Sequence, residues 1–301
     1  MKLVISASPH IDSGATTRKI MGDVLIALCP ALIAAIVIFG WRALLVTAVC
    51  AAACVFFEWG FERLCHKEST IGDLSAVVTG VILAYNLPVS IPLWQAVFGC
   101  LVAIVAVKQL FGGIGKNFAN PALVGRIVLF LSFSKTMTAW VFPDAVSSAT
   151  PLAQLAAGQK PELWTLLLGN HGGCIGETCA LALLLGGAYL LLRGVITWQT
   201  PVCFVGTVFV LSLILGQDAV RQILSGGLLL GAFFMATDYV TAPQTCWGRA
   251  LFGIGAGLLT CLIRFYGSYA EGVSFAILFM NILTPYLSKW TRSKPLGGVP
   301  A

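Results

Sequence analysis

Long runs of apolar residues, separated by short polar stretches, fill most of this 301-residue chain. A run of about 20 such residues can cross a bilayer as a helix, because a helix bonds all of its backbone polar groups internally. Charged residues make up only 10% of the chain, whereas soluble domains carry about 25%. The sequence therefore predicts an all-α polytopic membrane protein in contact with the lipid bilayer.

The apolar runs predict about ten transmembrane helices. The third and the eighth are short and end at polar or proline residues, around Asn86 and Asp238. The predicted spans are 22–40, 43–61, 71–87, 91–110, 117–133, 178–193, 198–216, 221–237, 248–266 and 270–288.

The basic residues predict the orientation of these spans. With ten spans both termini lie on one side, which collects twelve Lys and Arg residues against five on the other. Cytoplasmic loops carry the excess of basic residues, so both termini are expected in the cytoplasm and the 134–177 loop outside. The net charge of +6 is spread over short loops and tails, which is not the pattern of a nucleic-acid-binding surface.

The two halves of the chain resemble each other weakly. Gly22-Asp23 before the first span matches Gly176-Glu177 before the sixth, and two further pairs follow in the same order, in the third and eighth spans and at 117–121 and 281–285. Since each half has five spans, a repeated fold must be inverted in the membrane. The predicted organisation is a tail (1–21), a first five-helix repeat (22–133), an external loop (134–177), a second repeat (178–288) and a tail (289–301).

Several polar residues lie at membrane depth. Asn120 belongs to a glycine-rich stretch, 111–122, that reads either as a capped turn or, together with Asn86, as part of a flavin pocket. Arg126 falls inside the fifth span, where a lipid-facing charge is costly, so it should face the bundle and have a partner. That partner is a flavin phosphate, an acidic residue or backbone carbonyls.

The remaining titratable residues suggest no hydrolytic or metal site. Glu58 and Glu62, one turn apart, are expected to form a solvated helix end. Asp73 and Asp238 flank broken helices, where local pairing and contact with a coupling ion both stay open. Cys174 and Cys179 lie in the external loop, where a disulfide is possible; the other cysteines in apolar helices are expected to pack.

The external loop contains the segment Asp144–Thr150, which is similar to the flavinylation signature D-x-x-S-G-A-T of membrane redox subunits. In such subunits a transferase links FMN to the threonine by a phosphodiester, here Thr150. The small residues Ser147, Ser148 and Ala149 suit entry into another enzyme's cleft, although Ser148 replaces the usual glycine. We expect an exposed hydroxyl without fixed secondary structure; a plain Ser/Thr/Pro turn is the alternative.

A second match to the end of this signature lies in the N-terminal tail. Ser13-Gly14-Ala15-Thr16 fits S-G-A-T literally. However, His10 stands six residues before Thr16, where the signature has an aspartate, and the tail is predicted to be cytoplasmic. Thr16 is therefore not expected to carry the flavin.

These stretches together resemble the NqrB/RnfD family. The resemblance rests on Ser8–Ile11, Gly112–Ala122, Asp144–Thr150, Phe234–Asp238 and Phe279–Asn281, which appear in the family's order. It implies a urea-transporter-like bundle of two inverted five-helix repeats, covalent FMN on Thr150 and often a noncovalent riboflavin. It also implies a bacterial inner-membrane electron-transfer subunit whose partners are the other membrane and peripheral subunits of an ion-translocating oxidoreductase and the flavin transferase.

Within the family the short segment before the first span favours the RnfD branch, which couples ferredoxin:NAD electron transfer to Na⁺ or H⁺ movement. An NqrB-like component of a Na⁺-translocating NADH:quinone reductase is the first alternative. A non-redox channel or transporter for a small solute, with the same fold, is the second. The residues do not choose between Na⁺ and H⁺.

The predicted topology can be tested by single-cysteine labelling. Cysteines placed at Lys160 and Lys294 should react with a membrane-impermeant reagent from opposite sides of the membrane, because 134–177 is predicted outside and the C-terminal tail inside. Labelling of both positions from one side would refute the topology and the even number of spans.

Overall fold

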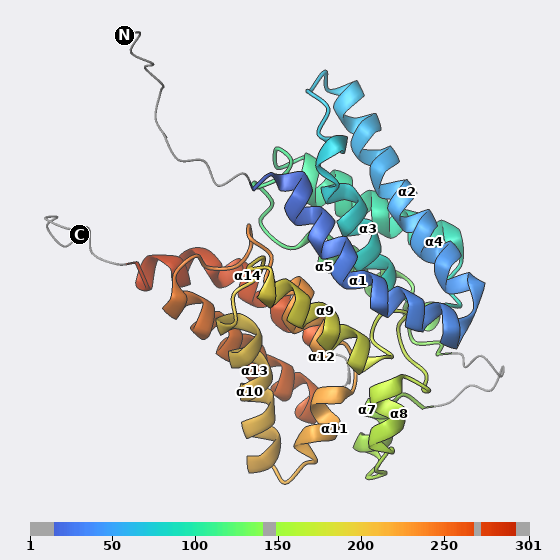
Figure 1. Ribbon diagram of the computed structural model, residues 1–301, viewed down its shortest axis with the longest axis vertical. Helices are drawn as coiled ribbons and strands as arrows, with labels where there is room; N and C mark the ends of the chain where they lie inside the picture. The colour runs from blue at the N-terminus through green and yellow to red at the C-terminus, as the bar shows by residue number, and fades with distance from the viewer. Residues whose placement is uncertain (1–14, 141–148, 268–271, 293–301) are drawn as a thin grey trace, which may run out of the picture.

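The computed structural model describes residues 15–140, 149–267 and 272–292. Within these residues the chain forms helices and no strand, so the predicted all-α class is confirmed for the part described. Figure 1 shows the helices of the first half, in blue to green, beside those of the second half, in yellow to red.

The first half follows the predicted ranges closely. A 3₁₀ turn precedes its third long helix, and its fourth helix continues without a break from α-helix into π-helix. The elements are α1 (Thr17–Phe39), α2 (Trp41–Leu64), η1 (Ile71–Asp73), α3 (Ser75–Tyr85), α4 (Leu93–Leu101), η2 (Val102–Gln109) and α5 (Pro121–Ser132).

The second half contains the other predicted broken helix. Gly226 has a φ of 67°, a conformation that glycine adopts without steric cost, and it separates α11 from α12. The elements are α9 (Ala180–Leu192), α10 (Gln199–Ile214), α11 (Ala219–Leu224), α12 (Leu228–Leu230), η3 (Gly231–Met235), α13 (Cys246–Tyr266) and α14 (Val273–Trp290).

The segment predicted as a plain external loop contains short helices. These are α6 (Ser134–Met137), α7 (Pro151–Ala156) and α8 (Leu163–Leu168). The described end of the signature segment, Ala149 and Thr150, lies outside helix, and Pro151 occupies the first turn of α7 directly after it. Proline is favoured there, since its fixed φ suits a helix and its missing N–H would have no partner in any case.

The two halves meet through equivalent helices. The first helix of each half packs against the other (α1 with α9), and so do the fifth helices (α5 with α14). Inside the first half α2 and α3 approach closely at Gly80, where an added methyl group would lie 2.7 Å from the Ala51 Cα atom. This arrangement agrees with a two-fold repeat, although the inverted ten-span repeat stays a prediction.

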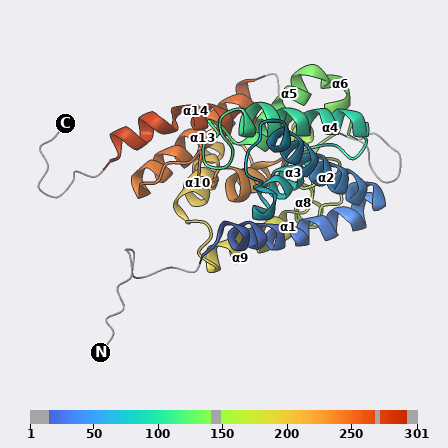
Figure 2. The same ribbon diagram turned by 90° about the horizontal axis from the view of Figure 1, so that it is seen from above.

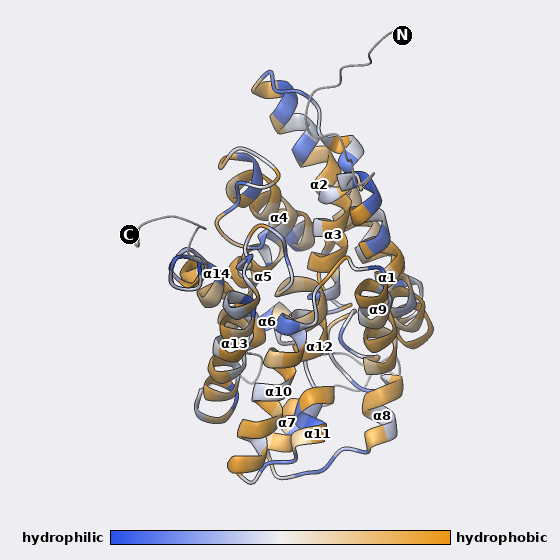
Figure 3. Ribbon diagram, turned by 60° about the vertical axis from the view of Figure 1, so that its left-hand side comes forward, coloured by the Kyte–Doolittle hydropathy of each residue, from blue (hydrophilic) through white to orange (hydrophobic). Residues whose placement is uncertain are grey.

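Among the described residues three helices, α1, α2 and α13, are long and apolar enough to cross a membrane by length and composition. Their outer faces carry large exposed apolar side chains; Val37 on α1 is 79% exposed. In Figure 3 hydrophobic residues, in orange, run along these helices. Since exposed apolar patches of this extent do not face water in soluble monomers, these faces are suited to lipid.

Figures 1 and 2 agree that α1 begins and α14 ends at the same side of the bundle. An even number of spans requires both ends of the bundle to lie on the same side of the membrane. The helices α7 and α8 lie towards the opposite side in Figure 1. Which side faces the cytoplasm stays a prediction from the basic residues.

Candidate functional site

A cavity of about 240 Å³ lies between the two halves, beside the start of α1. Most of its wall is aliphatic or aromatic, from α1, α3, α9 and η3. Its polar lining residues include Ser75, Lys108, Asn117, Asn120 and Asp238. Apolar walls with a few polar groups are typical of sites for small organic molecules.

Asn120 lines this cavity, whereas Asn86 lies behind its wall. Asn120 caps α5, since its Oδ1 accepts from the Ala122 N–H at 3.0 Å. Its Nδ2 donates to the Met235 carbonyl at 3.4 Å, and the Asn86 Nδ2 lies 3.4 Å from the Met235 sulfur. Both amides thus contact Met235 of η3. The capped-turn interpretation of Asn120 is confirmed, and contact with a flavin stays a prediction.

Arg126 is buried, as predicted, with 5% of its surface exposed. Its guanidinium donates to the Ser274 hydroxyl of α14 and lies 3.8 Å from the Cys174 sulfur. The Cys174 thiol in turn donates to the Asn86 carbonyl at 3.3 Å. No disulfide joins Cys174 and Cys179 in this structure; Cys174 instead links Arg126 to Asn86.

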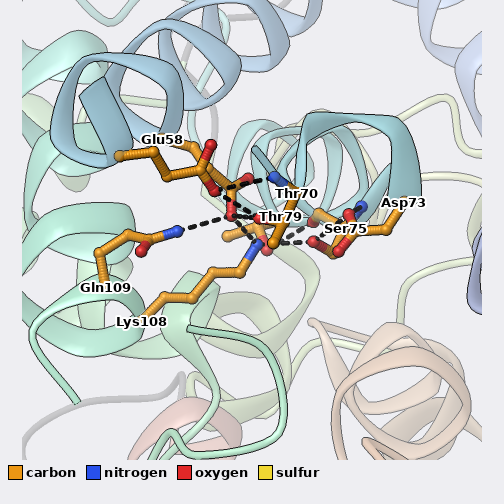
Figure 4. A network of polar contacts seen from close by, with 8 residues as sticks. Glu58, Thr70, Asp73, Ser75, Thr79, Lys108 and Gln109 are labelled. Carbon is orange, nitrogen blue, oxygen red and sulfur yellow. Dashed lines mark hydrogen bonds and ion pairs between the residues drawn. The ribbon is translucent and has the colours of Figure 1, made fainter. Parts of the chain in front are cut away.

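The prediction that Glu58 and Glu62 form a solvated helix end is wrong. Glu58 is fully buried and Glu62 is 3% exposed. Glu58 pairs with Lys108 of η2, whose Nζ lies 2.6 Å from Glu58 Oε1. Gln109 Nε2 donates to the same oxygen at 2.8 Å. Figure 4 shows these side chains converging, with Thr70 and Ser75 beside them.

The acidic residues beside the broken helices bond locally. Asp73 Oδ1 accepts from the backbone N–H and the hydroxyl of Ser75, at 2.7 and 2.6 Å. Asp238 Oδ2 accepts from the Thr241 hydroxyl at 3.0 Å. Of the two earlier alternatives, local pairing is therefore found for both. Among the described residues no three His, Cys, Asp or Glu side chains gather as a metal site would need.

Thr150 caps α7 and is only 8% exposed. Its Oγ1 accepts from the Ala153 N–H at 3.3 Å, because Pro151 starts the helix and Leu152 and Leu155 bury its apolar side. The expectation of an exposed hydroxyl is therefore wrong, although Thr150 itself precedes the helix as its cap. The flanking Ala149 is exposed, while Asp144, Ser147 and Ser148 lie outside the described residues.

Thr16 also caps a helix. Its Oγ1 accepts from the Lys19 N–H at 3.3 Å at the start of α1, and Thr16 is exposed. Solvent exposure alone would therefore favour Thr16 over Thr150 as the site of flavin attachment. The assignment to Thr150 rests instead on its sequence context and its neighbours.

A model of the NQR2, RnfD, RnfE family matches residues 4–297. The chain belongs to this family. The component designated D in the Na⁺-translocating ferredoxin:NAD⁺ oxidoreductase complex of Acetobacterium woodii is 46% identical over 99% of this chain and 96% of its own length. The corresponding component of the proton-translocating ferredoxin:NAD⁺ oxidoreductase complex of Clostridium ljungdahlii is 40% identical over 97% of this chain and 96% of its own length.

A more distant family member is the component of the same designation in the ion-translocating oxidoreductase complex of Halorhodospira halophila. It is 35% identical over 97% of this chain and 94% of its own length. Family membership thus extends over the whole bundle rather than over a single motif, and the predicted resemblance is confirmed.

The sequence did not predict a role for four residues of the polar cluster around Glu58, which are Lys108, Gln109, Thr70 and Ser75. Lys108 and Gln109 are 3% and 2% exposed. The signal was available, because Lys108 falls within the predicted span 91–110 and an ionisable residue inside a span indicates a functional site with a partner. Thr70 and Ser75 gave no such signal, since small hydroxyl residues are common at helix ends.

Replacing Arg126 should destabilise the junction between α5 and α14. In Arg126→Leu the buried Ser274 hydroxyl loses its donor, at a cost of about 1–3 kcal/mol; Arg126→Lys, which still donates, should cost less. Thermal unfolding in detergent measures both. Leu131→Ala on the same helix, at a position 69% exposed, serves as control, and equal melting temperatures for all variants would contradict the role of Arg126.

Proposed function

We propose that this protein is the RnfD-type membrane electron-transfer component of an ion-translocating ferredoxin:NAD⁺ oxidoreductase complex. The observation that carries this proposal is the 46% identity to such a component over 99% of the chain. Its partners are then the other membrane and peripheral subunits of that complex. It lies in the bacterial inner membrane with both termini in the cytoplasm.

The fold proposed for this role is ten spans in two inverted five-helix repeats. The pairing of α1 with α9 and of α5 with α14 supports it, since a two-fold axis through the bundle brings equivalent helices together. The breaks in the third and eighth spans, at Leu74 and Gly226, support it as well. Broken helices at matching positions are typical of transporters with repeats and line a site near the midplane.

Covalent FMN on Thr150 is proposed as the first cofactor. When bound, a flavin supplies the electron-transfer chemistry that ordinary side chains lack. A positive charge near α7 supports attachment at Thr150. A methyl group on Gly226 would lie 2.5 Å from Leu152 Cδ1 of α7 and 3.2 Å from Arg264 Nη2, and this guanidinium also donates to the Gln222 and Ser225 carbonyls. A guanidinium next to the start of α7 suits a phosphodiester.

A noncovalent riboflavin is proposed for the cavity between the halves. Its aliphatic walls fit the flat ring system, and the amides of Asn117 and Asn120 and the Lys108 ammonium offer hydrogen bonds to the polar edge of the ring. With about 240 Å³ the cavity has room for an aromatic ring system of this kind. Arg126 and Asn86 lie outside the cavity and position α5 and η3 around it.

The choice of ion stays open, because one relative is named for Na⁺ and another for protons. A quinone-reducing complex and a non-redox channel of the same fold are the competing functions. Neither is favoured by the two relatives that are 40% identical or more, which are named as parts of ferredoxin:NAD⁺ oxidoreductases. Flavin in the purified protein would exclude the channel.

Thr150→Ala should abolish covalent flavin fluorescence on a denaturing gel when the protein is produced together with its transferase. The protein should still insert, because losing a helix cap costs only about 1 kcal/mol. Thr150→Ser keeps the hydroxyl and the cap and should retain part of the label, and Asp144→Ala should lower it. Thr16→Ala is the matched control and should keep full fluorescence.

Peptide mass spectrometry decides between the two threonines. We expect an FMN adduct on the peptide that contains Asp144–Thr150. An adduct on the peptide that contains Ser13–Thr17, with none on the other, would overturn the assignment to Thr150.

Filling the cavity should displace only the noncovalent flavin. Ile20→Trp places an indole in the cavity wall of α1, whereas Ile26→Trp adds the same bulk at a position 55% exposed on the same helix. Extraction followed by chromatography should find riboflavin lost from the first variant and retained by the second. Retention of riboflavin in both would contradict its place in this cavity, while covalent FMN should be unchanged in both.

A further inference from the structure

A continuous chain of buried and half-buried polar side chains crosses the first half from its surface to the cavity. We call it the polar chain; it consists of Glu62, Thr70, Glu58, Lys108 and Ser75. The Thr70 hydroxyl donates to Glu62 Oε1 and lies 3.3 Å from Glu58 Oε1. Lys108 Nζ lies 2.6 Å from Glu58 Oε1 and 2.6 Å from the Ser75 hydroxyl. Each member is thus within hydrogen-bonding distance of the next, and Figure 4 shows the part from Thr70 through Glu58 and Lys108 to Ser75.

Both ends of the polar chain reach open space. Glu62 lines an opening of about 450 Å³ on the surface, together with Arg63, His66 and Lys67. Lys108 and Ser75 line the cavity between the halves. The inner side chains Thr70 and Glu58 therefore bridge two separate spaces, each of which is large enough to hold water or a ligand.

The charges of the polar chain do not balance. Two carboxylates, Glu58 and Glu62, face one buried ammonium, Lys108. Within the described residues Glu58 Oε2 and Glu62 Oε2 are buried and have no hydrogen-bond partner. A buried carboxylate without compensation is destabilising, and taking up one proton would remove the excess charge.

The other charged groups around the polar chain are already bound or face the opening. Lys67 Nζ donates to the Gln109 carbonyl at 3.3 Å and lies 5.1 Å from the centre of the Phe61 ring. Asp73 accepts from Ser75. Arg63 and His66 line the surface opening beside Glu62. In the part of the chain that the structure describes, none of these groups bonds to the second oxygen of either glutamate.

The π-helix η2 produces this geometry. Lys108 and Gln109 are neighbours in sequence, yet both are buried and both reach Glu58 Oε1. The wider turn of a π-helix brings consecutive residues closer to one face, and such turns are frequent at functional sites. A helix that served packing alone would gain nothing from turning a lysine inward.

We propose that the polar chain is a proton relay that connects the surface opening at Glu62 with the cavity between the halves. Its use in protonating a reduced flavin rests on the proposed function, whereas the path itself does not. In each cycle the Lys108 ammonium releases a proton into the cavity and takes one from the Glu58 carboxylic acid. Glu58 is reprotonated by Glu62 through the Thr70 hydroxyl, and Glu62 takes a proton from water. One proton enters, one leaves, and no electron moves.

The first test is infrared spectroscopy of the purified complex under a change of pH. A carboxylic acid C=O band that shifts in D₂O should appear in the wild type and disappear in both Glu58→Gln and Glu62→Gln. Asp23→Asn, which removes a carboxylate paired with Arg193 away from the polar chain, is the matched control and should keep the band. This measurement needs no bound flavin, so loss of flavin would refute the proposed function and leave the result on the relay intact.

The second test distinguishes a relay from a fixed structural cluster. Lys108→Met should slow the proton uptake that accompanies flavin reduction about a hundredfold, as loss of a general acid does. The neutral double variant Glu58→Gln/Lys108→Met avoids an unpaired buried charge and should be equally slow while it folds. Wild-type proton uptake in this double variant would overturn the proposal. A carboxyl band that responds to Na⁺ at constant pH, rather than to pH, would overturn it as well.

Discussion

A charge buried among apolar helices is stable only beside an opposite charge or a hydrogen-bonding group, and this requirement determines which helices of the bundle are joined. Arg126 of α5 bonds Ser274 of α14. Arg193, at the end of α9, pairs with Asp23 of α1 at 3.3 Å. These two contacts connect the same helix pairs that pack across the junction of the halves. At both helix pairs the halves are therefore joined by a cation from one half and an acceptor from the other.

Features that depend on residues close together in the sequence could be predicted from it, whereas contacts between distant residues could not. The helices depend on local apolar runs, so each of the ten predicted ranges overlaps at least one helix, and the burial of Arg126 follows from its place in a run. The prediction for Glu58 and Glu62 was wrong because a pair of acidic residues one turn apart near a helix end is usually solvated. The partner that buries Glu58, Lys108, stands 50 residues later, where no local pattern points to it.

Thr150 shows a different limit of sequence reasoning. The motif identifies its chemistry, but not that Pro151 and the leucines after it would form a helix and bury the hydroxyl. A threonine held in this way does not present a flexible tether. If the flavin is attached there, its phosphate is fixed relative to α7 and to the neighbouring break at Gly226, so the position of the ring is set by the fold of the bundle rather than by the length of a loop.

The π-helix η2 makes the fourth helix sensitive to the number of residues it contains. A π-turn accommodates one residue more than the α-turn it replaces. Removing a single residue from Val102–Gln109 would allow an ordinary α-helix, in which consecutive side chains point about 100° apart. Lys108 and Gln109 would then no longer share the face towards Glu58, although every side chain needed for the contact remained in the chain. In this segment a change in length of one residue matters more than most changes of residue type.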